Sequence, residues 1–361
     1  MAKIAFLIAD LTGGGAERVA ISLIEGFVRR GHQVDLLLMR KIGVFLEHLP
    51  REVRVIELRA ARIRNVVPPL VRYLRRERPD ALQVSIWPLP IAALVAARLA
   101  RVRTRVVLSE HCALSMQYGA SRTTRVRLNL STRLFYWLAD RIICVSKGVA
   151  TDLQRVSGLP ANRTKVVYNP IEQPTPAFRP DPDAVKAWPP AKHHILSVGT
   201  LKAQKNHRVL IEAFAKLGAE VDASLLILGE GPERRQLEGL IARLGLQDRV
   251  RLHGFASDTW SYYAAASLFV LSSDYEGFGN VLVEALAWGL PVVSTDCEAG
   301  PSEILTNGEF GTLVDCGSAE ALAQAMRRAI EQPVDAARLK DRARDFSPDK
   351  AVVGYLEALL G

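Results

Sequence analysis

Short apolar runs alternate with amphipathic stretches through the first half of the chain. Val19, Leu23 and Phe27 recur at steps of four, which predicts a helix over Glu17–Arg30. Runs of the strand type cover residues Lys3–Asp10, Gln33–Met39, Arg54–Leu58, Leu82–Ile86, Arg105–Ser109, Arg141–Ser146 and Lys165–Tyr168. Apolar strands that alternate with amphipathic helices are typical of a parallel sheet covered on both faces, so we expect an α/β fold.

The alternation stops at a proline-rich segment and then restarts. Residues 169–194 contain seven of the 19 prolines, which predicts a linker over 171–194. Strand-type runs follow at Ile195–Val198, Ser224–Leu228, Val250–His253, Leu268–Leu271 and Pro291–Ser294, and helical patterns at Asn206–Leu217, Pro232–Leu244, Thr259–Ala266, Asn280–Trp288 and Ala319–Glu331. We therefore expect two α/β domains, over 1–170 and 195–345, with a C-terminal helix at 346–361 that packs back on the first.

Composition agrees with two globular domains. The chain has 361 residues, 49% of them hydrophobic and 24% charged, which is enough apolar material for two cores. No apolar run approaches the ~20 residues of a membrane-spanning helix, and the N-terminus enters a strand without the pattern of a signal peptide, so we expect a cytoplasmic protein. The four cysteines form no CxxC pair or Cys/His cluster, which argues against zinc or disulfides.

Charge is divided unevenly between the two halves. Residues 1–170 carry 28 Lys and Arg against 12 Asp and Glu, a net charge of +16, whereas residues 171–361 carry 19 against 26, a net charge of −7. The basic half contains two groups of arginines, the second of them ahead of three aromatic residues: Arg59, Arg62, Arg64, Arg72, Arg75, Arg76 and Arg78, then Arg122, Arg125, Arg127 and Arg133 with Phe135, Tyr136 and Trp137. Such a surface suits anionic lipid, and the alternative is an ordinary arginine-rich face.

Three consecutive glycines follow the first predicted strand. Gly13, Gly14 and Gly15 let the backbone approach a ligand closely, and the helix that starts there favours an anion such as phosphate. The spacing matches neither GxGxxG nor GxxxxGK[ST], so neither a nicotinamide fingerprint nor a Walker loop is indicated. A tight turn without a ligand is the alternative.

Two glutamates frame a Gly-Phe-Gly helix start in the second half. Glu276 falls in a loop after the strand-type run Leu268–Leu271, and Glu284 falls on the second turn of the helix that follows. Carboxylates accept hydrogen bonds from sugar and ribose hydroxyls, while the N–H groups at a helix start suit phosphates. Either glutamate alone would more often be a capping or surface residue, but two of them across a helix start indicate a cleft suited to sugar hydroxyls and phosphates.

This segment, EGFGNVLVEALAWGLPVVST at 276–295, resembles the E-x7-E signature of the retaining glycosyltransferases of family 4. The resemblance extends in the family's usual order through GGGAERVA at 13–20, ADRIICVSKGVATDL at 139–153, VVYNPIE at 166–172, SVGTLKAQKNH at 197–207 and LLILGEGPERRQLEGLIARLGLQDRVRLHGF at 225–255. It implies the GT-B fold, two facing Rossmann-like domains with a cleft between them. It also implies a nucleotide-sugar donor bound by the second domain.

The resemblance assigns roles to individual residues. Glu276 is similar to the family's first glutamate, which contacts the donor sugar hydroxyls, and Glu284 to the second, which binds the ribose. Lys205 matches the lysine that neutralises the diphosphate. The other donor-binding positions that the resemblance implies are Gly14, Gly15, Gly277, Phe278, Gly279 and Asn280 around sugar and phosphates, and Gly229, Glu230, His253 and Gly254 near the base.

His111 follows the predicted strand Arg105–Ser109. A lone histidine is more often structural, but His111 resembles the family's histidine on the acceptor side of the donor sugar, which favours a functional role. The resemblance thus implies His111, Lys205 and Glu276 as the catalytic residues. Glu110, beside His111, either orients the imidazole, contacts the acceptor or is a solvated loop carboxylate.

The chain departs from the family pattern at Thr200. The family usually carries an arginine there, and a hydroxyl does not replace the charge of a guanidinium. We expect Lys202, or a basic residue of the first domain, to take its place at the phosphates.

Together these features predict a retaining, metal-independent glycosyltransferase of cell-surface polysaccharide or lipopolysaccharide biosynthesis. The expected donor is a nucleotide-diphosphate sugar, with UDP as the favoured nucleotide, and the expected acceptor is lipid-linked or a growing glycan. We expect no cofactor, no metal and no nucleic acid, and a peripheral place on the inner face of the plasma membrane. The letters Asp181-Pro182-Asp183 match a metal-binding DxD but fall in the proline-rich linker.

Three alternatives stay open at this point. A sugar-nucleotide epimerase shares the architecture and would convert the donor without an acceptor. A nicotinamide oxidoreductase lacks its fingerprint here. A nucleic-acid-binding protein would use the basic half, but it would leave the two glutamates unexplained.

Overall fold

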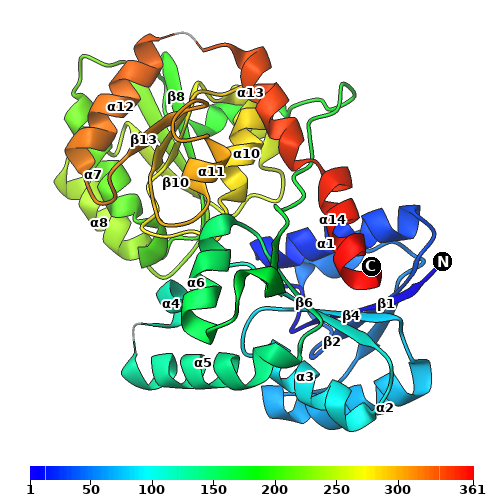
Figure 1. The fold of residues 1–361 in the computed structure, drawn as a ribbon. Coiled ribbons are helices and arrows are strands. Elements are labelled where there is room, and N and C mark those ends of the chain that lie inside the picture. The colour runs from blue at the N-terminus through cyan, green and yellow to red at the C-terminus, as the bar shows by residue number, and fades with distance from the viewer. Residues whose placement is uncertain (13, 120, 333) are drawn as a thin grey trace. The chain divides into compact units, whose positions relative to one another are not determined.

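A computed structural model describes residues 1–12, 14–119, 121–332 and 334–361 (Figure 1). The chain divides into two compact units, and each is an α/β unit with its own parallel sheet. Unit 1 comprises residues 1–170 and 346–361, and unit 2 comprises residues 171–345. The sheet order and the helix-covered layers are those of Rossmann-like domains.

Unit 1 contains a seven-stranded sheet in the order β3-β2-β1-β4-β5-β6-β7, with every described pairing parallel. Its strands are β1 (Lys3–Ile8), β2 (Gln33–Leu38), β3 (Arg54–Glu57), β4 (Ala81–Ser85), β5 (Arg105–Glu110), β6 (Arg141–Cys144) and β7 (Thr164–Val166). All seven predicted strands are confirmed. The first ends before Asp10 because that side chain accepts hydrogen bonds from Thr12 and Arg40 in the loop.

Helices cover both faces of this sheet. They are α1 (Gly15–Arg29), α2 (Val67–Glu77), α3 (Leu89–Ala100), α4 (Leu114–Tyr118), α5 (Arg122–Phe135), α6 (Lys147–Ser157) and α14 (Pro348–Leu360), with 3-10 turns η1 (Val44–His48), η2 (Ile63–Val66), η3 (Tyr136–Leu138) and η4 (Ala161–Arg163). The C-terminal helix α14 lies beside α1, as Figure 1 shows. Val352, Tyr355 and Leu359 join Phe27 in the core under α1, so the last turns of the chain complete the hydrophobic core of unit 1.

Unit 2 contains a six-stranded parallel sheet in the order β10-β9-β8-β11-β12-β13. Its strands are β8 (His193–Val198), β9 (Ala223–Leu228), β10 (Val250–Gly254), β11 (Leu268–Leu271), β12 (Val292–Thr295) and β13 (Thr312–Val314). The first five match the predicted runs. The sequence pattern missed β13, an edge strand of three residues with none fully buried. The equally short edge strand β7 is continued by the buried Val167, whereas exposed residues follow β13.

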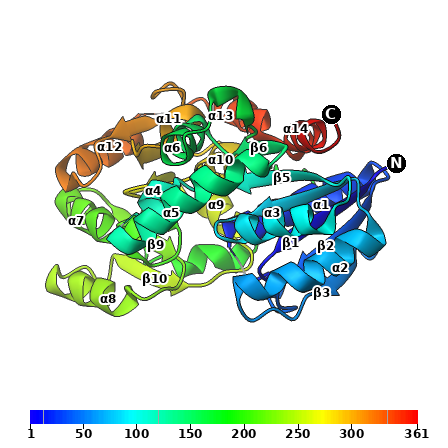
Figure 2. The same cartoon turned by 60° about the horizontal axis from the view of Figure 1, so that its bottom comes forward.

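The helices of unit 2 are α7 (His207–Leu217), α8 (Arg234–Arg243), α9 (Trp260–Ala265), α10 (Asn280–Ala287), α11 (Pro301–Ile304), α12 (Ala319–Glu331) and α13 (Ala336–Ala343), with 3-10 turns η5 (Pro182–Ala187), η6 (Ala203–Lys205) and η7 (Arg344–Phe346), the last of which reaches the start of the unit 1 segment. Helices α7 and α12 lie side by side (Figure 2). Phe214 and Met326, one from each helix, are fully buried in the core that they share with the sheet.

The proline-rich segment 171–194 is packed on unit 2. Trp188 is buried, stacks on His194 with 5.1 Å between ring centroids, and donates from Nε1 to the carbonyl of Ile195 at 3.2 Å. Asp181 accepts a hydrogen bond from the backbone N–H of Asp183 at 2.9 Å and so caps η5. The Asp-Pro-Asp letters thus mark a helix start, where an aspartate is a common cap.

No helix in the described part of the chain is both long and apolar enough to span a bilayer.

The order of the strands reverses once in each sheet. The reversal lies between β1 and β4 in unit 1, and between β8 and β11 in unit 2. In open parallel sheets, ligands bind at the carboxyl ends of the strands beside such a reversal. Each unit therefore has one edge where function is expected.

Candidate active site

Lys205 and Glu276 meet where the strand order of unit 2 reverses. Lys205 ends the turn η6 that follows β8, and Glu276 lies in the loop after β11. The Nζ of Lys205 is 2.6 Å from Oε1 of Glu276, and the two side chains are only 15% and 8% exposed. The hydroxyl of Ser273 donates to the same carboxylate oxygen at 2.6 Å. The site thus places a cation and a carboxylate together at the carboxyl edge of the sheet.

Hydrogen bonds between the two loops hold this pair in place. The Gln204 amide donates to the carbonyl of Tyr275 at 2.8 Å, and the Ser272 hydroxyl donates to the carbonyl of Lys205 at 2.9 Å. Thr295, at the end of β12, donates to the carbonyl of Ser273 at 2.6 Å. The supporting bonds therefore come from the ends of three neighbouring strands, and residues of unit 2 alone hold the ion pair in place.

Helix α10 starts beside this pair and carries the second glutamate. The N-cap residue of this helix is Gly279, whose φ of +97° favours glycine. Because glycine has no side chain, the N–H groups at the helix start are not covered by one. Gly300 allows the loop to come close, since a Cβ there would lie 1.8 Å from the carbonyl oxygen of Phe278. Glu284 is buried on the helix and accepts a hydrogen bond of 2.8 Å from the hydroxyl of Tyr263. An anion is favoured at such a helix start.

The four residues expected near the base also lie together, at the ends of β9 and β10. The N–H of Gly229 donates to the carbonyl of Gly254 at 2.8 Å. Glu230 is exposed and bonded twice by Arg234, at 2.7 and 2.9 Å, which lowers the pKa of its carboxyl. His253 is exposed, with Nε2 2.8 Å from the hydroxyl of Tyr262.

Loops after β8 and β9 come together through glycines. A Cβ on Gly229 would lie 2.0 Å from the carbonyl oxygen of Gly199, and one on Gly199 would lie 3.3 Å from the side chain of Lys205. Thr200 is exposed in the turn after β8, and the N–H of Lys202 donates to its carbonyl at 2.8 Å. Unit 2 thus gathers all of its predicted donor-binding residues along one edge of the sheet.

In unit 1 the predicted glycine segment opens α1. Gly13 is outside the described residues, Gly14 is the N-cap residue and Gly15 begins the helix. The carboxylate of Glu17 accepts hydrogen bonds from the backbone N–H groups of Gly14 and of Glu17 itself, and burial raises the pKa of this carboxyl. Sequence reasoning gave Glu17 no role, although a glutamate in a first helical turn is a frequent cap.

His111 directly follows β5 in the same unit. Its Nε2 is 2.9 Å from the hydroxyl of Ser109, and its Nδ1 is buried without a partner in the described structure. Burial lowers the pKa of this imidazole to about 4, so the ring is neutral near pH 7.

Glu110 is fully buried, so the alternative of a solvated loop carboxylate is wrong. Its Oε1 accepts a hydrogen bond of 2.5 Å from the hydroxyl of Tyr136, while Oε2 has no partner among the described residues. Burial raises the pKa of this carboxyl to about 7, although the bond from Tyr136 acts in the opposite direction. Tyr136 comes from η3, 26 residues further on, so local sequence gave no signal for this contact.

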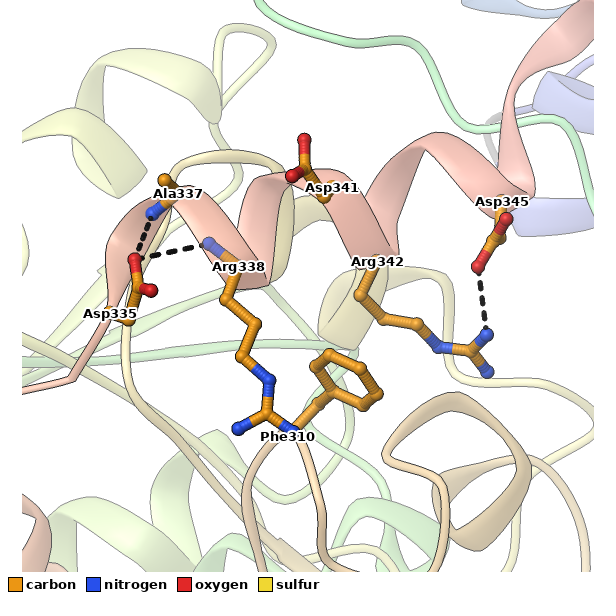
Figure 3. Close-up of a pocket in the computed structure, with 7 residues that line it drawn as sticks. All are labelled: Phe310, Asp335, Ala337, Arg338, Asp341, Arg342 and Asp345. Carbon is orange, nitrogen blue, oxygen red and sulfur yellow. Dashed lines mark hydrogen bonds and ion pairs between the residues drawn. The ribbon is translucent and has the colours of Figure 1, made fainter.

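A separate pocket of about 460 Å³ lies along α13 (Figure 3). Arg338 and Arg342 both lie over the ring of Phe310, at 4.9 and 5.6 Å from its centroid. Arg338 pairs with Glu309, and Arg342 donates to two backbone carbonyls. These arginines fasten α13 to the segment around residue 310, so the pocket is explained by packing within unit 2.

Comparison with known proteins places these features in a family. Residues 13–173 match the model of Glycosyltransferase Family 4, and residues 179–346 match that of Glycosyl transferases group 1. The chain is 30% identical, over the whole length of both proteins, to N-acetylgalactosamine-N,N'-diacetylbacillosaminyl-diphospho-undecaprenol 4-alpha-N-acetylgalactosaminyltransferase of Campylobacter jejuni. It is also 30% identical to the lipopolysaccharide core biosynthesis glycosyltransferase LpsE of Rhizobium meliloti, over 96% of each chain.

Solved structures of glycosyltransferases have the same fold as this chain. The crystal structure of HepE from Anabaena in complex with UDP and glucose is 24% identical to the chain and superposes with a TM-score of 0.82 over 99% of each chain. The structure of WaaG, described as a glycosyltransferase involved in lipopolysaccharide biosynthesis, superposes with a TM-score of 0.73. The chain therefore belongs to glycosyltransferase family 4, and it is a glycosyltransferase with the GT-B fold.

Proposed function

We propose that this enzyme moves a sugar from a UDP-sugar to a lipid-linked or growing glycan acceptor, with retention at the anomeric carbon and without a metal ion. The observation that carries the proposal is the Lys205–Glu276 ion pair beside the start of α10. It offers a cation for a diphosphate and a carboxylate for sugar hydroxyls within one hydrogen bond of each other. The C. jejuni relative is named for a diphospho-undecaprenol acceptor, and HepE was crystallised with UDP-glucose, which supports these substrate classes.

Several of the predicted donor residues have separate roles in this proposal. Lys205 and the positive end of α10 neutralise the diphosphate, which is the part that a metal ion plays in other transferases. Glu276 accepts hydrogen bonds from sugar hydroxyls. Glu284, oriented by Tyr263, accepts hydrogen bonds from the ribose. Residues 229–230 and 253–254 lie around the base.

In the proposed step, a bond forms between the acceptor oxygen and the anomeric carbon as the bond from that carbon to the diphosphate breaks. Attack occurs on the face that the diphosphate leaves, and the hydroxyl proton of the acceptor passes to the departing phosphate oxygen. His111 is neutral because the pKa of its ring is near 4, so it serves as a hydrogen-bond partner rather than as a cation.

A contribution of α1 to phosphate binding requires a rearrangement of Glu17. Its carboxylate already accepts the N–H of Gly14, at the place where an anion would bind. A negative phosphate and this carboxylate would repel each other. We propose that the Glu17 side chain turns away from the helix start when the donor binds.

We further propose that α5 attaches the enzyme to the anionic inner face of the plasma membrane. Val126, Leu130 and Leu134 follow each other at steps of four on this helix and, with Trp137, are 49–60% exposed. The flanking arginines Arg122, Arg125, Arg127 and Arg133 are exposed, and the helix contains no acidic residue. An apolar stripe between arginines suits an anionic lipid surface, where each basic residue adds about 1 kcal/mol.

The structure changes which predicted residues can take part in this attachment. Tyr136 is fully buried against Glu110 and therefore cannot face lipid. Arg75 donates to the carbonyls of Leu99 and Ala100 at the end of α3, and Arg76 is bonded to Glu77 at 3.0 Å. Substitution of Arg75 would therefore disturb the fold as well as the surface charge.

The test separates donor binding from transfer. Thermal unfolding with UDP, GDP or ADP in the presence of a chelator identifies the nucleotide, because a ligand at 100 times its Kd adds about 2.7 kcal/mol of stability. Incubation of a UDP-hexose with a diphospho-polyprenol glycan then gives a product whose anomeric configuration is read by NMR. We expect stabilisation by UDP and transfer with retention.

Other outcomes contradict particular parts of the proposal. Stabilisation by GDP or ADP alone would show that the donor is a GDP-sugar or an ADP-sugar instead of a UDP-sugar. A product of inverted anomeric configuration would exclude retention. A requirement for divalent metal would exclude metal-independent transfer. Isomerised donor in the absence of acceptor would indicate a sugar-nucleotide epimerase.

A further inference from the structure

A buried chain of side-chain hydrogen bonds ends at His111. Ser85 and Ser109 stand opposite each other in the register of β4 and β5, and their hydroxyl oxygens are 2.8 Å apart. The Gln83 amide donates to the Ser109 hydroxyl at 2.6 Å, and that hydroxyl is 2.9 Å from Nε2 of His111. Gln83 and Ser109 are almost completely buried, and the proposed reaction uses neither of them.

The hydrogen-bond capacity of Ser109 limits how this chain can be arranged. A hydroxyl has one hydrogen to donate and two acceptor positions. The Gln83 amide takes one acceptor position, so one hydrogen and one acceptor position are left for Ser85 and His111. When Ser109 donates to His111 it accepts from Ser85, and when it donates to Ser85 it accepts from His111. Tyr355, on α14, also lies close enough to Ser109 to affect its own pKa, but its hydroxyl makes no hydrogen bond of good geometry among the described residues, so Ser85 and His111 remain the partners considered for Ser109.

The two arrangements leave His111 in opposite tautomers. In a neutral imidazole one nitrogen carries hydrogen and the other accepts. If Nε2 accepts from Ser109, Nδ1 carries the hydrogen and is a donor. If Nε2 donates to Ser109, Nδ1 is an acceptor. Since Nδ1 is buried and has no partner among the described residues, the arrangement decides what His111 offers to a ligand.

The first arrangement satisfies more buried groups. In it the Ser85 hydroxyl donates to Ser109 and the Ser109 hydroxyl donates to Nε2, so that among Ser85, Ser109 and His111 the Nδ1 hydrogen alone lacks a partner in the described structure; the amide oxygen of Gln83 lacks one in both arrangements. In the second, both Nδ1 and the hydrogen of the nearly buried Ser85 hydroxyl lack a partner in the described structure. Each buried polar group without a partner is unfavourable, and among these three residues the first arrangement leaves one such group where the second leaves two, which favours the first.

We propose that Ser109 is a positioning residue that holds His111 in the tautomer with hydrogen on Nδ1, so that this nitrogen donates to an oxygen of the bound sugar or diphosphate. The ligand side of this inference rests on the proposed function. The tautomer itself is a property of the free enzyme and can be measured without substrate. An experiment can therefore distinguish failure of the tautomer assignment from failure of the proposed ligand contact.

The experiment reads the ring directly. Two-bond proton–nitrogen correlations of the enzyme with ¹⁵N-labelled histidine identify the protonated nitrogen, and the His111→Gln variant assigns the signal. We expect hydrogen on Nδ1 between pH 6 and 8 in the unsubstituted enzyme. Ser109→Ala should shift the population toward hydrogen on Nε2 and lower kcat about tenfold, which corresponds to the loss of one hydrogen bond. The KM for the donor should change less than kcat.

Two control variants make the result specific. Ser109→Thr keeps the hydroxyl and should restore both the tautomer and kcat. Ser157 is another buried serine of unit 1, bonded to the carbonyl of Leu153 at 2.6 Å, and Ser157→Ala should change neither. Hydrogen on Nε2 in the unsubstituted enzyme, or an unchanged tautomer in Ser109→Ala, would overturn the inference. Full transfer by His111→Gln would instead remove the proposed contact of His111 with the donor.

Discussion

The ammonium of Lys205 and the carboxylate of Glu276 form an ion pair of 2.6 Å although 71 residues separate them along the chain. Both groups are largely removed from water, so each depends on the other for a partner of opposite charge. The pair joins the loop after β8 to the loop after β11 and so spans the point where the strand order of unit 2 reverses. Folding of unit 2 therefore assembles the two charges that the proposed donor requires.

Lys205→Met should lower kcat by about 10²–10³-fold, because it removes one group that stabilises the departing diphosphate. The same variant leaves Glu276 without its cation and should reduce the free energy of unfolding by about 1–3 kcal/mol. Addition of Glu276→Gln should restore part of that stability but no activity. Urea unfolding and steady-state transfer assays measure the two effects.

The variants at Lys205 and Glu276 form a double-mutant cycle, and an exposed ion pair of the same unit is its control. Lys216 and Glu320 lie 3.1 Å apart with both side chains at least half exposed. Their coupling free energy should be below about 1 kcal/mol. An equal coupling in the two pairs would contradict the role given to the burial of Lys205 and Glu276.

Gly300→Ala should disturb the start of α10. At φ +97° a side chain is strained, and the added Cβ would meet the carbonyl oxygen of Phe278 at 1.8 Å. We expect a loss of about 2–5 kcal/mol in the free energy of unfolding, with weaker UDP binding in calorimetry. Gly317 has φ +78° with nothing within 4 Å, so Gly317→Ala should cost only about 1–2 kcal/mol and leave UDP affinity unchanged. Equal UDP affinity in both variants would argue against the role of this loop.

Glu110→Gln should change how stability depends on pH. The pKa of Glu110 is near 7 in the folded protein and near 4.5 without the fold, so its protonated form stabilises the fold below about pH 4.5 and that contribution is lost as the pH rises through 7. The amide does not ionise. The stability of the variant relative to the unsubstituted protein should therefore increase by up to about 3 kcal/mol between pH 5 and 8. Urea unfolding across this pH range measures the difference.

Tyr136→Phe serves as the matched variant for this titration. It removes the hydrogen bond that favours the charged carboxylate of Glu110, so the loss of stability should move to higher pH. His111 and His207, whose pKa values burial lowers, titrate in both proteins and cancel in the comparison. A stability difference that does not change with pH would show that Glu110 remains ionised.

Replacement of Leu130 and Leu134 by serine should weaken binding to vesicles that contain phosphatidylglycerol. Each exposed leucine that enters the interface contributes about 1.5–3 kcal/mol when fully buried, so sedimentation should show a loss of at least tenfold in the partition constant. The free energy of unfolding should be unchanged, because both side chains are exposed.

Serine substitutions at other exposed apolar positions control for general surface effects. Leu244 in unit 2 and Val353 on α14 are 40% and 47% exposed, and their serine variants should bind vesicles as the unsubstituted protein does. Replacement of Arg122, Arg125 and Arg127 by glutamine should reduce both the affinity and its dependence on salt. Unchanged binding by both the leucine and the arginine variants would rule out α5 as the attachment surface.

The sheets were predictable from the sequence because most of their strands are short, apolar and buried on both faces. Twelve of the described strands matched such runs, and only the three-residue edge strand β13 carried too little pattern. The family motifs brought Lys205, Glu276 and Glu284 to one site. The local sequence did not predict which side chains bond to the site carboxylates. Tyr263 donates to Glu284 from 21 residues away, and Tyr136 donates to Glu110 from 26 residues away. Such contacts depend on three-dimensional packing, which periodicity does not encode.

The place of α14 in the core of unit 1 determines the order in which the chain can fold during synthesis. Unit 2 is one continuous stretch, 171–345, and can complete its sheet as soon as that stretch has left the ribosome. Unit 1 is made first but finished last, because its core waits for Val352, Tyr355 and Leu359. A protein that lacks residues 346–361 would lose the covering of the sheet that carries His111, while the sheet that carries Glu276 would be intact. Synthesis of residues 346–361 is thus a condition for assembling the unit that holds His111.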